Sequence, residues 1–234
     1  MTSRSEQELA ESALRASLAR RSSRELLLDP HRADDSPVRL NRSTPIRRLL
    51  PFACRALGAG LETELGSFWT SVDFADLPCG SAAEQFAVFL KRRVENGTLR
   101  LHFLPELLDF ELASSELRFL PRQEFLAQGD TGALTQPLSR DAGLAIHPLM
   151  RISRFPCDAE ALFATLMGRP REARNARRET FLLLSVLKQP SPEIYQLDPK
   201  LGRRLWALQN VGTFGGSDAE LRLLGDLRVI VRSH

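Results

Sequence analysis

The side chains of this chain that could take part in catalysis are few and scattered. None of the four histidines, His31, His102, His147 and His234, has another histidine three or four residues away, so no metal-binding histidine pair of a helix is present. His147 precedes Cys157 by ten residues, and a nucleophilic Cys–His pair is one interpretation of these two. The alternative interpretation is a histidine at the start of a strand and a buried thiol.

Motifs that bind phosphate or activate a serine are also missing. The sequence contains neither GxxxxGK[ST] nor GxSxG, and the glycine-rich run Gly212–Gly216 has no clear strand-loop-helix context. Acidic residues that could form a cluster are Asp73, Asp76, Glu106, Asp109 and Glu111, although their spacing specifies no particular chemistry. We therefore expect no catalytic residue, no metal site and no cofactor in this chain, and a binding protein rather than an enzyme.

The densest apolar stretch is Leu101–Leu120, which has helical periodicity and carries several acids. Glu111 falls among the leucines of this helix, where an unpaired carboxylate would be costly. We expect a buried Glu111 that is paired with an arginine: Arg47, Arg48 or Arg55.

Composition excludes several classes of protein. Of the 32 basic residues only three are lysine, and the net charge of +3 is too small to indicate nucleic-acid binding by itself. The three cysteines are far apart and form no CxxC, which argues against disulfides and zinc. No apolar run reaches the roughly 18 residues of a membrane span, and the polar N-terminus is not a secretory signal. A cytoplasmic location is expected.

Composition and periodicity predict an α+β fold with three regions. Residues 1–43 are an N-terminal extension and linker, because residues 29–45 are polar and contain three prolines. Residues 44–130 form a helical scaffold and docking domain, and residues 140–234 form a small α/β domain similar to a winged helix. The predicted elements of the last region are a strand within Leu144–Phe155, a helix Ala159–Met167 capped by Asp158, strands Thr180–Leu187 and Glu193–Leu197, a helix from Asp198-Pro199 to Leu208, and a helix Asp218–Leu224 capped by Ser217.

Two binding functions fit this architecture. A winged-helix regulator would bind DNA with arginines such as Arg151, Arg154, Arg177 and Arg178, although the helix Pro199–Leu208 carries few basic residues and aromatic side chains are scarce. Alternatively, an open sheet edge could accept an extended peptide as an added strand. Arginines near that edge would then attract acidic positions of the peptide.

The order of features resembles a known family. The residues that carry the resemblance are TPIRRLLPFACRAL, FWTSV, EQFAVFL, LPELLDFELASSEL, AIHPLMRISRFPCDAEALFATL and PEIYQLDPKLGRRLWAL, within residues 44–210. This pattern is similar to the partner subunits of multinuclear non-heme iron oxidative enzymes in ribosomal peptide natural-product biosynthesis, and most similar to the methanobactin biosynthesis protein C. Residues 1–40 lie outside the pattern.

The resemblance implies a non-catalytic subunit with a helical domain and a winged-helix-like domain that recognises peptides. It would bind a TIM-barrel oxidase that holds the iron, together with the leader of a precursor peptide. A core cysteine would thereby be positioned for oxidative modification, such as oxazolone and thioamide formation. Neither a membrane nor a nucleic acid is an expected partner.

Under this hypothesis the peptide adds to the edge of Leu149–Phe155 or of Thr180–Leu187. The expected peptide-binding residues are Leu149, Arg151, Ile152, Arg154, Phe155, Arg178, Thr180, Leu182 and Leu184. The expected residues for docking to the enzyme are Trp69, Glu106 and Asp109.

Overall fold

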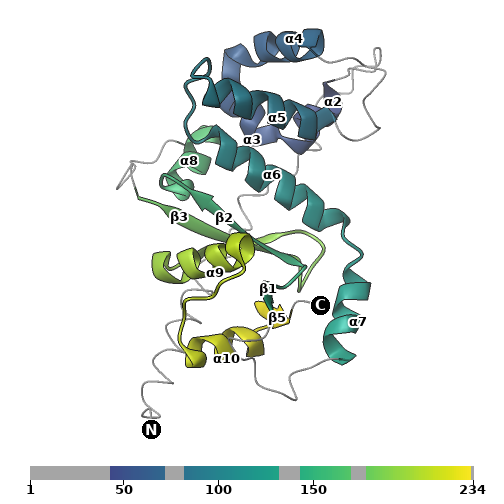
Figure 1. The fold of residues 1–234 in the computed structure, drawn as a ribbon. Helices are drawn as coiled ribbons and strands as arrows, with labels where there is room; N and C mark the ends of the chain where they lie inside the picture. Colours follow the sequence, from purple (N-terminus) through teal and green to yellow (C-terminus); the bar gives the residue numbers. More distant parts are fainter. Residues whose placement is uncertain (1–42, 72–81, 132–142, 170–177, 233–234) are drawn as a thin grey trace. The chain divides into compact units, whose positions relative to one another are not determined.

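The computed structural model describes residues 43–71, 82–131, 143–169 and 178–232, and it confirms the predicted α+β class (Figure 1). The described residues up to 131 form helices and turns, and small antiparallel sheets with further helices follow. The predicted N-terminal extension, residues 1–43, lies outside the described residues except for Ser43.

Contacts divide the described chain into two compact units. The helical unit comprises residues 43–71, 82–115, 155–169 and 178, and the sheet unit comprises residues 116–131, 143–154 and 179–232. The division falls inside one helix and one strand rather than at the predicted boundary between residues 130 and 140. The short helix after Cys157 therefore groups with the helical unit, whereas the sequence analysis placed it with the C-terminal region.

The helical unit is built from short helices and one long one. Its elements are α2 (Thr44–Leu49), α3 (Pro51–Leu57), a 3₁₀ turn (Gly58–Gly60), α4 (Leu61–Ser71), α5 (Ala82–Glu95), the first three turns of α6 (Leu104–Phe119) and α8 (Ala159–Leu166). The break between α2 and α3 falls at Pro51, because proline has no N–H to continue the helix. Gly58 makes the second break with a φ of 52°, a conformation that favours glycine.

Aromatic side chains fill the core of the helical unit at two places. Phe68 of α4 lies 5.2 Å from Phe86 and 5.6 Å from Phe89 of α5, measured between ring centroids. Elsewhere Phe163 of α8 lies 5.1 Å from both Phe52 and Phe110. These ring contacts explain why α8 belongs to this unit although it follows β2 in the chain.

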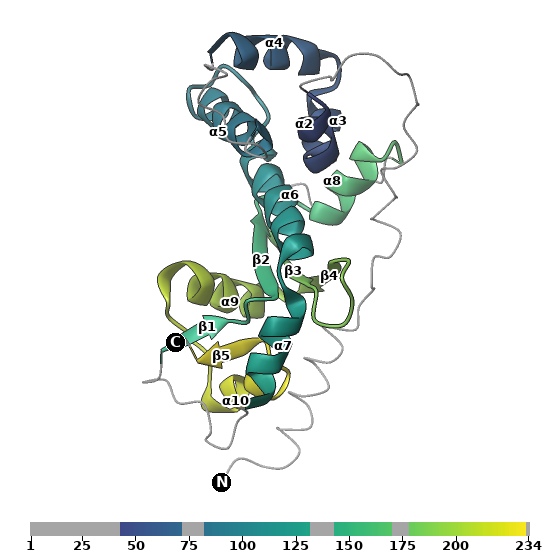
Figure 2. The same ribbon diagram turned by 90° about the vertical axis from the view of Figure 1, so that its right-hand side faces the viewer.

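The sheet unit contains two antiparallel sheets. Its elements are α7 (Arg122–Thr131), β1 (Leu144–Ile146), β2 (Met150–Phe155), β3 (Thr180–Ser185), β4 (Glu193–Leu197), α9 (Pro199–Val211), α10 (Asp218–Asp226) and β5 (Ile230–Arg232). The larger sheet has the order β2-β3-β4, which Figure 2 shows with β3 in the middle. The smaller sheet pairs β1 with β5, with Ala145 opposite Val231.

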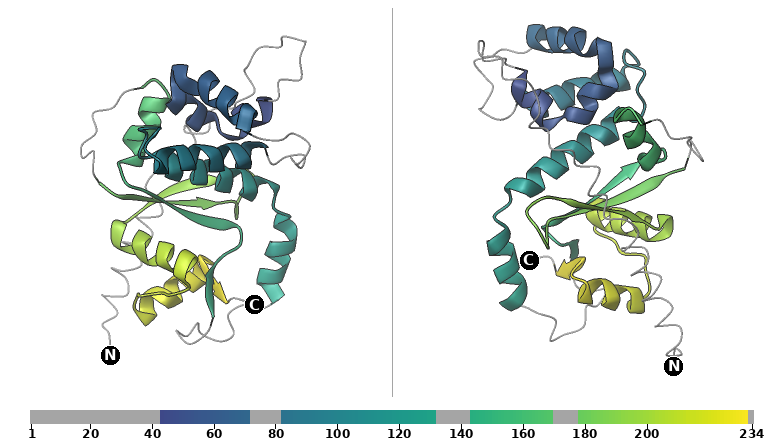
Figure 3. Two further views of the ribbon diagram at one scale, coloured as in Figure 1. Left: turned by 45° about the horizontal axis from the view of Figure 1, so that its top comes forward. Right: turned by 180° about the vertical axis from the view of Figure 1, so that it is seen from behind.

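The strand β3 is buried along its whole length, as its continuous apolar sequence predicts. One face of the larger sheet contributes Ile152, Leu183 and Leu197 to a core with leucines of α9 and α10. α9 packs against β1 and β3, and both views of Figure 3 show it beside the strands. The middle strand and one face of the larger sheet are therefore buried, so its two outer strands, β2 and β4, are the places where another strand could add.

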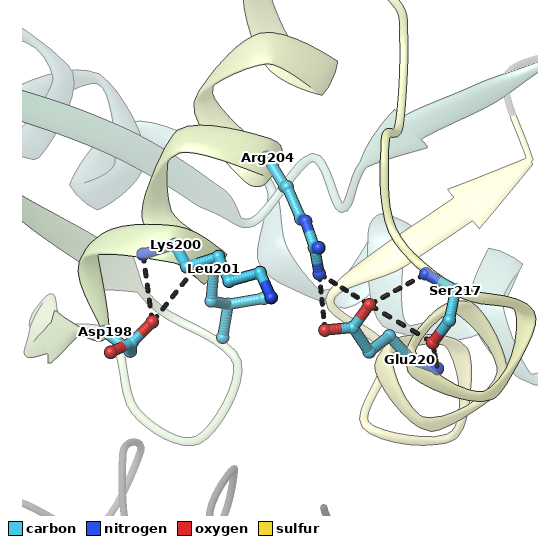
Figure 4. Close-up of polar contacts among 6 residues, drawn as sticks. All are labelled: Asp198, Lys200, Leu201, Arg204, Ser217 and Glu220. Carbon is cyan, nitrogen blue, oxygen red and sulfur yellow. Dashed lines mark hydrogen bonds and ion pairs between the residues drawn. The ribbon is translucent and has the colours of Figure 1, made fainter.

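Polar caps fix the two last helices (Figure 4). Asp198 accepts a hydrogen bond from Lys200 N at 2.9 Å at the start of α9, and Ser217 and Glu220 form a capping box at the start of α10. Arg204 of α9 donates to both carboxylate oxygens of Glu220, at 2.5 and 2.6 Å. Both bonds come from Nη1, and this charge-assisted pair ties the two helices together.

Candidate strand-binding edge

The order of the larger sheet decides which strands have a free side. β3 is hydrogen-bonded to β2 on one side and to β4 on the other. The prediction that Thr180–Leu187 offers an edge is therefore wrong. Its expected contact residues Thr180, Leu182 and Leu184 are at most 6% exposed, so they belong to the interior of the sheet.

The outer edge of β2 is closed by a side chain of α9. Val186 N donates to Leu149 O at 3.0 Å, so by the alternation of antiparallel strands Ile152 points its backbone groups away from β3. Gln209 satisfies both of these groups: Ile152 N donates to Gln209 Oε1 at 2.7 Å, and Gln209 Nε2 donates to Ile152 O at 3.0 Å. The amide of Gln209 thus occupies the place of a neighbouring strand's peptide group.

The backbone groups of Met150, two residues before Ile152, also face outward, and they too have hydrogen-bond partners. Its N–H donates to His147 O at 2.8 Å, and its carbonyl accepts from Arg151 Nη1 at 2.9 Å. The edge that we expected in Leu149–Phe155 is therefore occupied from Met150 to Ile152 by groups of the same unit.

The outer edge of β4, unlike that of β2, has backbone groups without a partner among the described residues. In the β3–β4 ladder Ser185, Leu183 and Phe181 lie opposite Glu193, Tyr195 and Leu197. The backbone N–H of Val186 faces β2, and backbone groups of successive residues face alternate sides of a strand. Ser185, Leu183 and Phe181 therefore face β4 and form the hydrogen-bonded pairs of this ladder. On β4, the backbone groups of Ile194 and Gln196 consequently face outward, away from β3. Within the described part of the chain these outward groups have no hydrogen-bond partner.

The side chains next to this open edge lie on the two faces of β4, and each face carries one polar and one largely apolar side chain. On the face towards α9, the Tyr195 hydroxyl donates to Glu193 Oε2 at 2.7 Å, and its ring packs against the core. Burial, followed by the hydrogen bond to Glu193, raises the pKa of Tyr195 to about 12, so its hydroxyl remains a donor at neutral pH. On the opposite face Ile194 is buried and Gln196 is exposed.

Two of the arginines expected to contact a peptide already have acidic partners. Arg151 donates to Glu116 at 2.9 Å. Arg154 donates to Glu179 at 2.6 Å and lies over the ring of Trp206 at 5.3 Å from its centroid. Arg178 is exposed.

The two arginines of α9 likewise have acidic partners. Glu179 accepts from Arg203 at 2.8 Å in addition to Arg154, and Arg204 pairs with Glu220. Burial alone would raise the pKa of Glu179, but the hydrogen bonds from Arg203 and Arg154 outweigh it, and the pKa lies below its usual value. This internal neutralisation weakens the case for a DNA-binding surface on α9.

The three residues expected to dock to an enzyme all lie in the helical unit. The indole of Trp69 donates to Ser43 Oγ at 3.3 Å, and its ring contacts that of Phe68 in a tilted arrangement, with 4.6 Å between centroids. Asp109 is exposed and pairs with Lys91. Glu106 is half-buried, and its Oε2 has no hydrogen-bond partner among the described residues.

Glu111 is buried as predicted, with only 5% of its surface exposed, but its donors are not the expected arginines. Phe52 N and Ala53 N donate to its two oxygens at 2.6 and 2.9 Å. These N–H groups belong to the first turn of α3, where backbone donors have no partner within the helix. Glu111 therefore serves as a cap supplied by another helix.

The interpretation of His147 and Cys157 as a catalytic pair gains no support. His147 belongs to the sheet unit, where its Nδ1 accepts from Leu149 N at 3.1 Å, and burial followed by Arg228 lowers its pKa. Cys157 belongs to the helical unit, where burial followed by Glu106 raises the pKa of its thiol. A raised pKa disfavours the thiolate that nucleophilic attack requires.

Within the described ranges no group of three or more histidine, cysteine and acidic side chains could hold a metal ion. None of the helices described is long and apolar enough to span a membrane. Comparison with protein-family models gives no match, and comparison with curated proteins gives no significant match.

Sequence reasoning missed the two features that define the edge. The position of Gln209 beside β2 depends on how α9 packs, and a single glutamine in a helix carries no such signal. The open side of β4 follows from the strand order, which local patterns do not specify. The limits of β4 itself, Glu193–Leu197, were predicted correctly.

Proposed function

We propose that this chain is a non-catalytic, peptide-binding subunit that accepts an extended segment of a precursor peptide as an added strand on β4. The observation that carries the proposal is the outward-facing backbone of Ile194 and Gln196, which has no partner in the described residues. Exposed strand edges bind extended peptides through main-chain hydrogen bonds, with side-chain contacts adding specificity.

The identity of the partner enzyme in this proposal comes from the sequence resemblance. A TIM-barrel oxidase with several iron ions would carry out the oxidation of a core cysteine, and the helical unit of this chain would dock to it. The iron belongs to that enzyme, and the complex acts in the cytoplasm. Holding the leader of the peptide in one subunit raises the effective concentration of the core at the iron to the millimolar range.

The test begins with the gene neighbourhood, in which the proposal requires genes for a TIM-barrel iron oxidase and for a short cysteine-containing precursor peptide. The full chain is co-expressed with that oxidase. The complex is then titrated calorimetrically with the short cysteine-containing peptide of the same gene neighbourhood. We expect co-purification and binding of the peptide. A chain that co-purifies with no oxidase, and binds no peptide in its presence, would disprove the proposal.

Gln196→Pro tests the edge itself. Proline at this position removes an outward N–H while leaving the bonds between β3 and β4 intact, because Gln196 faces away from β3. We expect peptide binding to weaken by about tenfold, which corresponds to about 1.4 kcal/mol. Gln196→Thr keeps the N–H and suits a strand, so it is the matched control and should bind like the parent.

A further inference from the structure

An antiparallel strand added to β4 would meet its side chains in a defined order. Ile194 and Gln196 would form the hydrogen-bonded pairs with that strand, so Glu193 and Tyr195 fall at non-hydrogen-bonded positions. Opposite residues are closest at such positions, with Cα atoms about 4.5 Å apart, and their side chains interact directly. The chemistry of Glu193 and Tyr195 therefore selects the residues opposite them.

Glu193 and Tyr195 present different chemistry on the same face of the strand. One oxygen of Glu193, Oε2, accepts from the Tyr195 hydroxyl, while Oε1 has no partner among the residues that the structure describes. Both residues are half-buried, and the ring of Tyr195 adjoins the apolar core that includes Leu197. A strand beside them would meet a carboxylate at one position and an aromatic surface two residues away.

We propose that the strand accepted by β4 carries a basic side chain opposite Glu193 and an apolar side chain opposite Tyr195. Because the added strand runs antiparallel to β4, its motif reads, from N- to C-terminus, apolar, any residue, then lysine or arginine. This inference rests on the proposed function and names the ligand chemistry of the same edge. The sequence analysis expected arginines near the edge to attract acidic residues of the peptide. Because Arg151 and Arg154 are already paired with Glu116 and Glu179, the inference replaces those acidic residues with a basic one.

The experiment uses two synthetic peptides and the full-length protein at low salt. Both peptides are alternating Thr/Val strands of about nine residues, one with Leu-Thr-Lys at its centre and the other with Leu-Thr-Glu. Binding is followed by NMR through the amide signals of Ile194 and Gln196. We expect the lysine peptide to bind about three- to tenfold more tightly than the glutamate peptide, as is typical of opposed charges across strands.

Glu193→Lys should reverse this preference. Glu95→Lys is the matched control, because it makes the same change of charge at an exposed site of the helical unit and should leave the preference as it is. Equal binding of the two peptides, or the same reversal with Glu95→Lys, would overturn the inference while strand addition at β4 stands. If neither peptide shifts the two amide signals, strand addition at β4 fails, and the inference fails with it.

Discussion

At the scale of single residues, Glu111 shows how burial and hydrogen bonding oppose each other. Burial raises its pKa from 4.5 to about 8, although the N–H groups of Phe52 and Ala53 and the charge of Arg55 all lower it. The folded protein therefore holds the proton more tightly than the unfolded chain does. Stability from this group is fully present below pH 4.5 and is lost as the pH rises towards 8.

Glu111→Gln should remove this dependence on pH. For the parent we expect the free energy of unfolding to fall by an amount on the order of a few kcal/mol between pH 5 and pH 8.5, and for the variant we expect a nearly flat profile over this range. Urea unfolding at a series of pH values measures both profiles. Glu95→Gln, at an exposed carboxylate, is the control and should follow the parent. A parent profile that rises with pH would show that the backbone donors outweigh burial.

At the scale of elements, local sequence patterns were sufficient for most of the described helices and strands after residue 143. Asp158 and Ser217 were predicted as caps, and Asp198-Pro199 was predicted to start a helix. Each of Asp158, Asp198 and Ser217 accepts a backbone N–H at the start of its helix. Such caps depend on residues within one turn, so the sequence specifies them. The arrangement of the strands depends instead on contacts between distant residues. For that reason the central position of β3 and the glutamine that closes β2 could not be predicted.

Gly202 marks the closest approach of α9 to the sheet. A Cβ atom at this position would lie 2.4 Å from the Cβ of Phe181 on β3, so Gly202→Ala should destabilise the protein by about 1–3 kcal/mol through overpacking. Gly66→Ala in α4 is the matched control, because a Cβ there meets nothing within 4 Å. Alanine should stabilise that helix by about 0.5–1 kcal/mol. Chemical denaturation of both variants measures the contrast, and equal effects would contradict the packing of α9 on β3.

Gln209 provides the second test at this scale. Gln209→Leu removes the partner of two backbone groups of Ile152, and we expect a loss of about 1–3 kcal/mol in the free energy of unfolding. Asn210→Leu is the neighbouring control, since Asn210 is exposed and bonds only to the carbonyl of Trp206 in its own helix. Faster hydrogen exchange of the Ile152 amide in Gln209→Leu alone would locate the effect at β2. Indistinguishable stabilities of the two variants would show that Gln209 does not secure this edge.

At the scale of the whole molecule, the two units do not follow the chain in sequence. The chain passes from one to the other within α6, within β2 and between Arg178 and Glu179. The sheet unit also depends on residues ahead of the predicted domain boundary, because Arg151 pairs with Glu116 and Arg122 donates to the Leu187 carbonyl. The sequence predicted a helical region followed by a mixed one, as the structure has them, but it could not show these exchanges.

A pair of fragments tests this dependence. The fragment 140–234, which corresponds to the predicted C-terminal domain, lacks both Glu116 and Arg122, whereas the fragment 116–234 retains them. We expect the shorter fragment to be less stable by about 1–3 kcal/mol, because Arg151 and the Leu187 carbonyl lose their partners. Urea midpoints followed by circular dichroism make the comparison. Equal midpoints would show that residues 116–139 contribute nothing to the sheet unit.

The burial of Cys54 has a consequence for selectivity in the proposed oxidase complex. Its surroundings, with desolvation first and the charge of Glu111 second, raise the pKa of the thiol to about 12. At neutral pH only about one in 10⁵ such thiols is ionised, and the ionised form is the one that binds metals and reacts with oxidants. A subunit that delivers a substrate cysteine to an oxidising centre would thus keep this cysteine of its own from becoming a competing substrate.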